Sequence, residues 1–233
     1  MAGLRERKKD RTRATLIETA IGLCERQGFD RTTVEQIAAL ADVSPRTFSR
    51  YFATKDAVIH ALVDEIVEAI AVQLLRQPAE LSELDALRTA HVDMLQATKS
   101  APPGGLTAER FMTTVRIVCS SPPLLASSEH RRDAVIEALA RRMGVGVDER
   151  KVQLAIAVWW AVILVAVADW GPDTDWQQWT ADMVVGRIDD TFAQFGELIA
   201  RVRQPVASLP GEIGSTTFDA GFVNTASTQR PLR

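Results

Sequence analysis

Two short stretches between residues 33 and 52 constrain the fold most, because each has its own helix start signal and few residues separate them. Thr33 can cap a helix, and Gln36, three residues later, completes a capping box. Ser44 followed by Pro45 can start another helix at once. The pattern predicts two short helices joined by a tight turn. A longer amphipathic helix, which ends at Gly28, is expected before them.

This arrangement indicates a helix-turn-helix, whose second helix enters the major groove of DNA. That groove is about 12 Å wide, so the helix must be short and must present small polar or basic groups outward. Val43, Phe48 and Phe52 are the expected apolar anchors of this helix. We therefore expect a three-helix DNA-binding domain at residues 13–60, preceded by a basic N-terminal arm at residues 1–12.

The rest of the chain has helical periodicity, interrupted by glycine, proline and serine clusters. It predicts helices at about residues 55–76, 80–99, 106–120, 123–143, 148–170 and 175–204. No stretch alternates with period two for long enough to predict a strand, so the expected class is all-α. Residues 61–204 would form one helical domain. Residues 205–233, rich in Pro, Gly, Ser and Thr, are expected to be a disordered tail.

Charge and motif content narrow the function classes. Residues 1–60 carry 11 Lys and Arg against 8 Asp and Glu, whereas residues 61–204 carry 14 against 20, so a polyanion partner is expected at the N-terminal end. The two cysteines, Cys24 and Cys119, lie far apart and form no metal-ligand spacing. No catalytic motif is present, so we expect no enzyme, no cofactor and no metal site. Without a secretory signal or a membrane-length apolar run, a cytoplasmic location and no membrane contact are expected.

The run TVEQIAALADVSPRTFSRYFATKDAV, from Thr33 to Val58, resembles the DNA-binding signature of the TetR family of transcription regulators. In that family the recognition helix ends in an aromatic pair, and a Ser/Thr-Lys-Asp/Glu step leads into the fourth helix. The resemblance covers roughly residues 12–60. It implies a regulator whose N-terminal domain binds double-stranded operator DNA.

The resemblance also implies roles for single residues. The base-reading positions are Pro45, Arg46 and Thr47. The positions that match phosphate or backbone contacts are Thr33, Ser44, Ser49, Arg50, Tyr51 and Lys55. Arg50 stands where the family often has Tyr, which should make that contact more ionic. The N-terminal arm matches extensions that follow the DNA backbone or the minor groove.

In the family, the last two long helices form a four-helix dimer interface, which implies a homodimer through residues 148–204 here. An apolar stripe from Trp176 to Val202 fits that role, and a two-fold dimer would read a palindromic operator. The remaining helices would enclose an effector pocket, and the polar residues His91, Arg110, Arg116 and His130 could orient a ligand. The candidate lining residues, for which plain core packing is the competing interpretation, are Met94, Phe111, Met112, Val115, Cys119, Met143 and Trp159.

The sequence thus predicts a ligand-responsive transcriptional regulator, in the form of a repressor that a small lipophilic molecule releases from a palindromic operator. Three alternatives stay open: a transcriptional activator, a ligand-blind DNA-binding protein, and an all-helical enzyme. Neither the effector nor the operator sequence follows from these residues.

Overall fold

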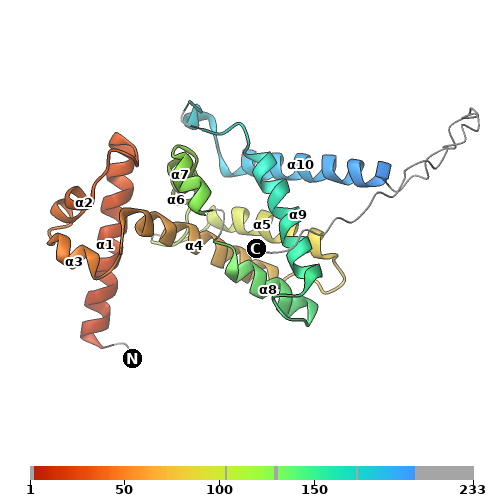
Figure 1. Cartoon of the computed structure of the whole chain (residues 1–233), viewed down its shortest axis with the longest axis horizontal. Helices are drawn as coiled ribbons and strands as arrows, with labels where there is room; N and C mark the ends of the chain where they lie inside the picture. The colour runs from red at the N-terminus through yellow and green to blue at the C-terminus, as the bar shows by residue number, and fades with distance from the viewer. Residues whose placement is uncertain (1–2, 103, 129–130, 172, 203–233) are drawn as a thin grey trace, which may run out of the picture.

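The computed structural model describes residues 3–102, 104–128, 131–171 and 173–202, and all regular structure in these ranges is helical (Figure 1). This confirms the predicted all-α class. The elements in chain order are α1 (Leu4–Gln27), α2 (Val34–Leu40), α3 (Pro45–Ser49), α4 (Lys55–Leu74), α5 (Glu83–Thr98), α6 (Ala108–Cys119), α7 (Pro122–Ser128), α8 (Asp133–Met143), α9 (Arg150–Ala166), the 3-10 turn η1 (Trp176–Gln178) and α10 (Ala181–Val202).

The first three helices form the N-terminal unit, in which α2 and α3 lie on one side of α1 (Figure 1). Leu16 of α1, Ile37 of α2 and Phe48 of α3 meet in its core and are at most 1% exposed. Burying an apolar side chain of this size contributes about 1.5–3 kcal/mol. The two short helices are therefore held by tertiary packing, because helices of this length are not stable alone.

The turn between α2 and α3 depends on Asp42, whose φ is +54°. This left-handed conformation lets the N–H of Val43 reach the carbonyl of Ala38 at 2.9 Å, which closes the end of α2. Aspartate adopts it at lower cost than most residues other than glycine. No glycine marks this turn in the sequence, yet the chain reverses there as the helix-turn-helix pattern requires.

Helix α4 connects the N-terminal unit to the larger helical body (Figure 1). Leu62 packs in the N-terminal core, whereas Ile70, two turns later, packs in the second core. Ile117 of α6 and Leu124 of α7 also belong to the N-terminal core. The boundary expected between residues 60 and 61 therefore lies inside a continuous helix, and the core of the N-terminal unit extends into α6 and α7.

In the larger body, α4 packs against α5 and α8, and α10 packs against α5 and α9. Trp159 of α9 is 1% exposed at the centre of this core. Ion pairs from Arg88 to Asp189 and from Lys99 to Asp182, at 2.6 and 2.5 Å, join α5 to α10 at the surface. No helix in the described ranges is both long enough and apolar enough to cross a bilayer.

The helix boundaries differ from the prediction in two places before α9. Helix α1 begins at Leu4 instead of residue 13, because Arg, Lys and Glu favour helix and extending a formed helix needs no new nucleus. The expected helix at 123–143 is divided into α7 and α8, which end at Ser128 and begin at Asp133. The hydroxyl of Ser127 donates to the carbonyl of Leu124 at 3.0 Å, and such side-chain bonds compete with the backbone bonds of a helix. No glycine or proline marks this break in the sequence.

The last helix is also shorter than expected. Asp175 caps the 3-10 turn, and a separate helix begins after Thr180, whose hydroxyl accepts from the N–H of Met183 at 3.4 Å. Trp176 and Trp179 therefore precede α10 and pack against Trp170 at ring distances of 5.3 and 4.7 Å. The predicted disordered tail at 205–233 lies outside the described residues.

Candidate DNA-binding surface and ligand cavity

The three residues predicted to read bases form the first turn of α3. Pro45 and Arg46 are exposed and Thr47 is half-buried, while Phe48 anchors the opposite face in the core. The Ser44 hydroxyl accepts from the N–H of Thr47 at 3.1 Å and lies 3.0 Å from its hydroxyl. These bonds fix the N-terminal turn of α3, and its outer side chains are free to meet a partner.

The residues matched to phosphate contacts surround this turn. Thr33 caps α2, since its hydroxyl accepts from the N–H of Gln36 and its own N–H donates to the Gln36 side chain, at 3.2 and 3.0 Å. The Ser49 hydroxyl donates to the carbonyl of Pro45 at 3.1 Å. The Arg50 guanidinium lies 5.5 Å from the centre of the Tyr51 ring and lowers the pKa of that phenol. Their contacts with DNA remain predictions.

Lys55 has a structural role that the sequence did not reveal. Its ammonium donates to the carbonyls of Phe29, Asp30 and Thr32 at 2.9, 3.3 and 3.1 Å. It also lies 4.3 Å from the centre of the Phe29 ring. An ammonium has three donors, so these bonds use all of them. Lys55 therefore clamps the loop after α1 to the start of α4, whatever it contributes to DNA binding.

The basic N-terminal half of α1 extends the surface formed by α3. Lys8, Lys9, Arg11 and Arg13 are all exposed on this helix. The Arg13 guanidinium lies 5.3 Å from the centre of the Phe52 ring. Phe52 follows shortly after the end of α3. Lys8, Lys9 and Arg11, which were expected in a separate arm at residues 1–12, therefore stand on helix α1 beside the helix-turn-helix.

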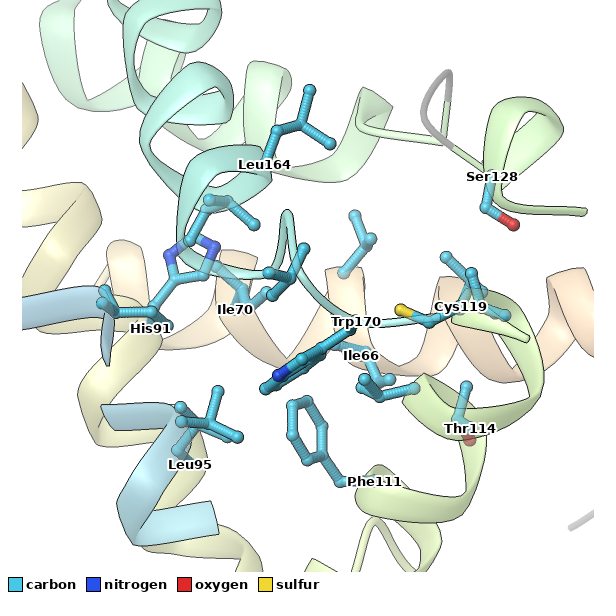
Figure 2. A pocket seen from close by; sticks show the side chains of 18 of the residues that line it. Ile66, Ile70, His91, Leu95, Phe111, Thr114, Cys119, Ser128, Leu164 and Trp170 are labelled. Carbon is cyan, nitrogen blue, oxygen red and sulfur yellow. The ribbon is translucent and has the colours of Figure 1, made fainter. Parts of the chain in front are cut away.

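A cavity of about 180 Å³ lies in the larger body among α4, α5, α6, α7, α9 and α10 (Figure 2). Ile66 and Ile70 of α4, Leu95 of α5 and Phe111 of α6 form much of its wall. Trp170, from the segment after α9, projects between Leu95 and Phe111 (Figure 2). None of the described residues that line it is Asp, Glu, Lys or Arg. The cavity therefore suits an apolar guest.

His91 is the one titratable nitrogen group among the described lining residues, and it is held neutral. Its Nδ1 lies 2.8 Å from the carbonyl of Leu87, and Trp159 Nε1 donates to its Nε2 at 3.2 Å. This pair of contacts places the proton on Nδ1. Burial lowers the pKa of His91 to about 4, since a charged imidazolium would lose its hydration there. Both ring nitrogens are already bonded, so His91 offers shape and not charge to the cavity.

Of the predicted pocket residues, Met94, Phe111, Val115 and Cys119 line this cavity. The structure places Met112, Met143 and Trp159 in the surrounding core instead. Sequence reasoning missed the contributions of α4, Trp160 and Trp170, and of Val184 and Ile188 in α10. The apolar residues in the second half of α4, beyond the N-terminal unit, were the sequence signal that could have placed α4 in the cavity wall.

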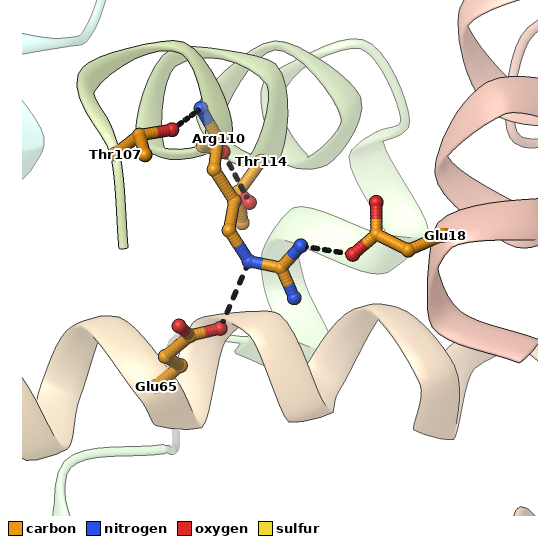
Figure 3. A network of polar contacts seen from close by, with 5 residues as sticks. All are labelled: Glu18, Glu65, Thr107, Arg110 and Thr114. Atoms are coloured by element: carbon orange, nitrogen blue, oxygen red, sulfur yellow. Dashed lines mark hydrogen bonds and ion pairs between the residues drawn. The ribbon is translucent and has the colours of Figure 1, made fainter. Parts of the chain in front are cut away.

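Helix α6 has a second, polar face that contacts α1 (Figure 3). Arg110, whose side chain is 16% exposed, pairs with Glu18 of α1 and donates to Glu65 of α4 at 3.1 Å. Six residues further along α6, Arg116 pairs with Glu25 of α1. Arg110 and Arg116, which the sequence analysis considered as groups to orient a ligand, therefore face the N-terminal unit. His130, the fourth such residue, lies outside the described residues.

Comparison with known proteins identifies the family. Residues 16–62 match the family described as bacterial regulatory proteins, tetR family. The HTH-type transcriptional regulator TcmR of Streptomyces glaucescens is 36% identical over 180 residues, which cover 74% of this chain and 80% of TcmR. The chain belongs to the TetR family. As a TetR-family member it is a DNA-binding regulator of transcription, and the helix-turn-helix of α2 and α3 lies within the matched residues.

Solved TetR-family structures show lower sequence similarity to the chain. FadR of Thermus thermophilus, a transcriptional repressor in complex with lauroyl-CoA, is 18% identical, covers 86% of this chain and 100% of its own, and has a TM-score of 0.48. SmeT, the repressor of the multidrug efflux pump SmeDEF of Stenotrophomonas maltophilia, is 20% identical, covers 78% of this chain and 89% of its own, and has a TM-score of 0.46.

Proposed function

We propose that this TetR-family regulator is a ligand-released repressor. Two copies bind a palindromic operator, and a small lipophilic molecule in the cavity lowers their affinity for it. The observation that carries the proposal is the double role of α6, which lines the cavity on one face and is ion-paired to α1 on the other. In this proposal Arg46 and its neighbours Pro45 and Thr47 read bases, while the exposed residues around them contact phosphates.

The spacing along α6 supports a route by which a ligand acts on α1. Phe111, Val115 and Cys119 are four residues apart and share the cavity face. Arg110 and Arg116 project from the same turns toward Glu18 and Glu25. A guest that pushes on the first face must therefore move the groups that hold α1. Since α1 supports α2 and α3, this motion changes where the recognition helix lies.

In a dimer the two recognition helices must lie about 34–36 Å apart to enter successive major grooves. A ligand that favours another spacing binds the DNA-free state better and needs no contact with DNA. Typical coupling of about 1–3 kcal/mol lowers operator affinity by roughly 5- to 150-fold. Linkage is reciprocal, so operator DNA must weaken ligand binding by the same factor.

Exposed apolar side chains support a dimer through residues 148–204. Leu154 and Val165 of α9 are 62% and 61% exposed, and Leu198 of α10 is 59% exposed. Exposed large apolar side chains on two helices that contact each other are expected of an interaction surface. Phe192, by contrast, packs against Trp159 of its own protomer at a ring distance of 5.8 Å. The proposed interface therefore uses the outer faces of α9 and α10 and not the whole stripe from Trp176 to Val202.

The test begins with an operator selected from random DNA and a lipophilic compound screened for its release. We expect the compound to bind more weakly to the operator complex, by the factor with which it weakens operator binding. Equal ligand affinities with and without DNA would mean a ligand-blind DNA-binding protein. In vitro transcription from a promoter that overlaps the operator then distinguishes a repressor, which lowers transcript yield, from an activator, which raises it.

The role of α6 is tested by Arg110→Met, which removes the contacts to Glu18 and Glu65. The matched control is Arg88→Met, because Arg88 also pairs with an acid on another helix, but within the larger body. We expect Arg110→Met to reduce the release factor while ligand affinity without DNA is retained. The control should leave the release factor unchanged. The same reduction in both variants would refute transmission through α6.

A further inference from the structure

We propose that Trp170 sets the size limit of the guest, because its indole fills part of the space that the other lining side chains enclose. The cavity then admits an uncharged hydrocarbon of one aromatic ring with a short substituent and excludes a second ring. The inference rests on the proposed function, since it assigns a specificity-determining residue to the same cavity.

Trp170 differs from most of the cavity wall in the element that carries it. Ile66, Ile70, Leu95 and Phe111 stand on helices, whereas Trp170 belongs to the segment between α9 and η1. Figure 2 shows its indole pointing from that segment into the space that the labelled residues surround, between Leu95 and Phe111. The residue is only 7% exposed, so nearly the whole ring is enclosed. The indole therefore takes up volume that a larger guest would need.

An aromatic cluster supports this indole. Its ring packs edge-to-face against Trp176 and Trp179, with ring centres 5.3 and 4.7 Å away. Neither Trp176 nor Trp179 is among the described residues that line the cavity. The Arg187 guanidinium of α10 lies in turn 5.2 Å from the centre of the Trp179 ring. A guest could therefore displace the indole only by breaking the packing of this cluster.

Polar contacts fix the backbone on both sides of Trp170. The two Nη atoms of Arg187 donate to the carboxylate of Asp169, directly before it, at 3.0 and 2.7 Å. Such a bidentate pair defines geometry as well as energy. Directly after it, the N–H of Gly171 donates to the hydroxyl of Thr174 at 2.8 Å. The indole is thus a rigid part of the wall, and a rigid wall selects a guest by size because it does not repack around a larger one.

The volume left beside the indole defines the size limit. At about 180 Å³ the cavity is somewhat larger than the one of roughly 150 Å³ that holds benzene in an engineered protein. It is smaller than the sites of roughly 300–1,000 Å³ that bury drug-sized ligands. A benzene ring with a short alkyl chain therefore fits without rearrangement.

The cost of exceeding this limit is large. In a fitted apolar pocket one methylene group too many weakens binding by roughly 10–200-fold. A second aromatic ring exceeds the available space by more than that. Replacing Trp170 by a small residue removes an indole, which is itself a pair of fused rings, and so makes room for the second ring.

Two uncharged hydrocarbons, ethylbenzene with one ring and biphenyl with two, test the inference by titration calorimetry on the full chain without DNA. We expect the wild type to bind ethylbenzene at least about 10-fold more tightly than biphenyl. Trp170→Ala should reverse this preference. Biphenyl gains at least about 10-fold because the second ring now fits, and ethylbenzene binds more weakly because it loses contact with the indole.

A second variant and a matched control complete the test. Trp170→Leu keeps an apolar side chain of intermediate size, so its preference should lie between those of the wild type and Trp170→Ala, and it serves if the alanine variant does not fold. Trp176→Ala removes an indole from the same cluster but not from the described cavity wall, and it should keep the wild-type preference. Tighter binding of biphenyl by the wild type, an unchanged preference in the Trp170 variants, an equal shift in the control, or no binding of either hydrocarbon would each overturn the inference.

The same samples separate this inference from the proposed function. If the preference reverses in Trp170→Ala and neither hydrocarbon releases the operator from the wild type or the variant, the size limit holds and the proposed switch fails for these guests. If ethylbenzene releases the operator and the preference is the same in all the variants, the switch holds and the role of Trp170 is refuted.

Discussion

The substitution Lys55→Met separates the role that family resemblance implies for this lysine from the role that the structure gives it. The resemblance implies a phosphate contact. The structure instead places the ammonium on the carbonyls of Phe29, Asp30 and Thr32, where it holds the loop after α1. Methionine keeps most of the apolar stem and removes the charge and all three donors, so the substitution tests the clamp with little change in packing.

The expected loss of stability follows from the burial of each contact. A hydrogen bond from a charged donor contributes about 1.5–3 kcal/mol, but water can replace the bond to the exposed carbonyl of Asp30. The bonds to Phe29 and Thr32 are partly buried, and the contact with the Phe29 ring adds about 0.5–1 kcal/mol. Because partial exposure weakens each of these contacts, we expect the free energy of unfolding to fall by about 3 kcal/mol. For a protein of this size that lowers Tm by roughly 6–12 °C.

The assay is thermal unfolding followed by circular dichroism, with Arg46→Met as the control. Arg46 is an exposed cation on the same surface, so its loss should leave Tm nearly unchanged. Salt dependence of DNA binding then tests the phosphate contact, because losing one such contact reduces the slope of log K against log salt by about 0.9. A Tm for Lys55→Met equal to that of the control would refute the clamp. A reduced slope at an unchanged Tm would mean that Lys55 contacts phosphate and does not stabilise the fold.

Three further predictions concern the turn, the buried histidine and the dimer. Asp42 has a φ of +54°, so Asp42→Val should destabilise the protein by about 1–2 kcal/mol in urea unfolding. Asp42→Gly should be nearly neutral, because relief of strain is offset by the larger entropy of the unfolded chain; equal losses in both variants would contradict this. Since burial lowers the pKa of His91 from 6.5 to about 4, the unfolded chain takes up this proton first as pH falls. The free energy of unfolding should therefore decrease by about 3 kcal/mol between pH 6.5 and 4, and His91→Gln should lack that part of the slope. The double variant Leu154→Glu and Val165→Glu should sediment as a folded monomer where the wild type sediments as a dimer, because both side chains are exposed in one protomer. An unchanged dimer would place the interface elsewhere.

Features that depend on neighbours a few residues apart were predictable. The capping residues Thr33 and Ser44 bond within three residues, as their sequence context indicates. The apolar anchors Phe48, in α3, and Phe52, three residues after its end, are both buried in the N-terminal core, as their apolar character and spacing indicate. These local signals, together with the motif from Thr33 to Val58, were enough to identify the helix-turn-helix and the family.

The pocket prediction shows where local signals stop. Periodicity marks Met112 and Trp159 as apolar helix positions as readily as it marks Phe111 and Val115. Only the packing of six helices decides that Phe111 and Val115 face a cavity and the other two face the surrounding core. The same holds for Phe192, which the stripe in α10 suggested for the dimer and which contacts Trp159 of its own protomer.

The sequence by itself therefore determined the class, the DNA-binding motif and most helix positions, because capping, periodicity and turn formation depend on residues close together in the chain. The tertiary structure decided what each helix face contacts. Arg110 meets Glu18 across 92 positions, and Lys55 reaches the loop at Phe29 across 26. Neither pair shares a helix or a turn, so no spacing rule connects its members. Such contacts arise because the packing of apolar helix faces brings distant segments together. The polar side chains on the other faces of these helices then pair with the groups that packing has placed beside them.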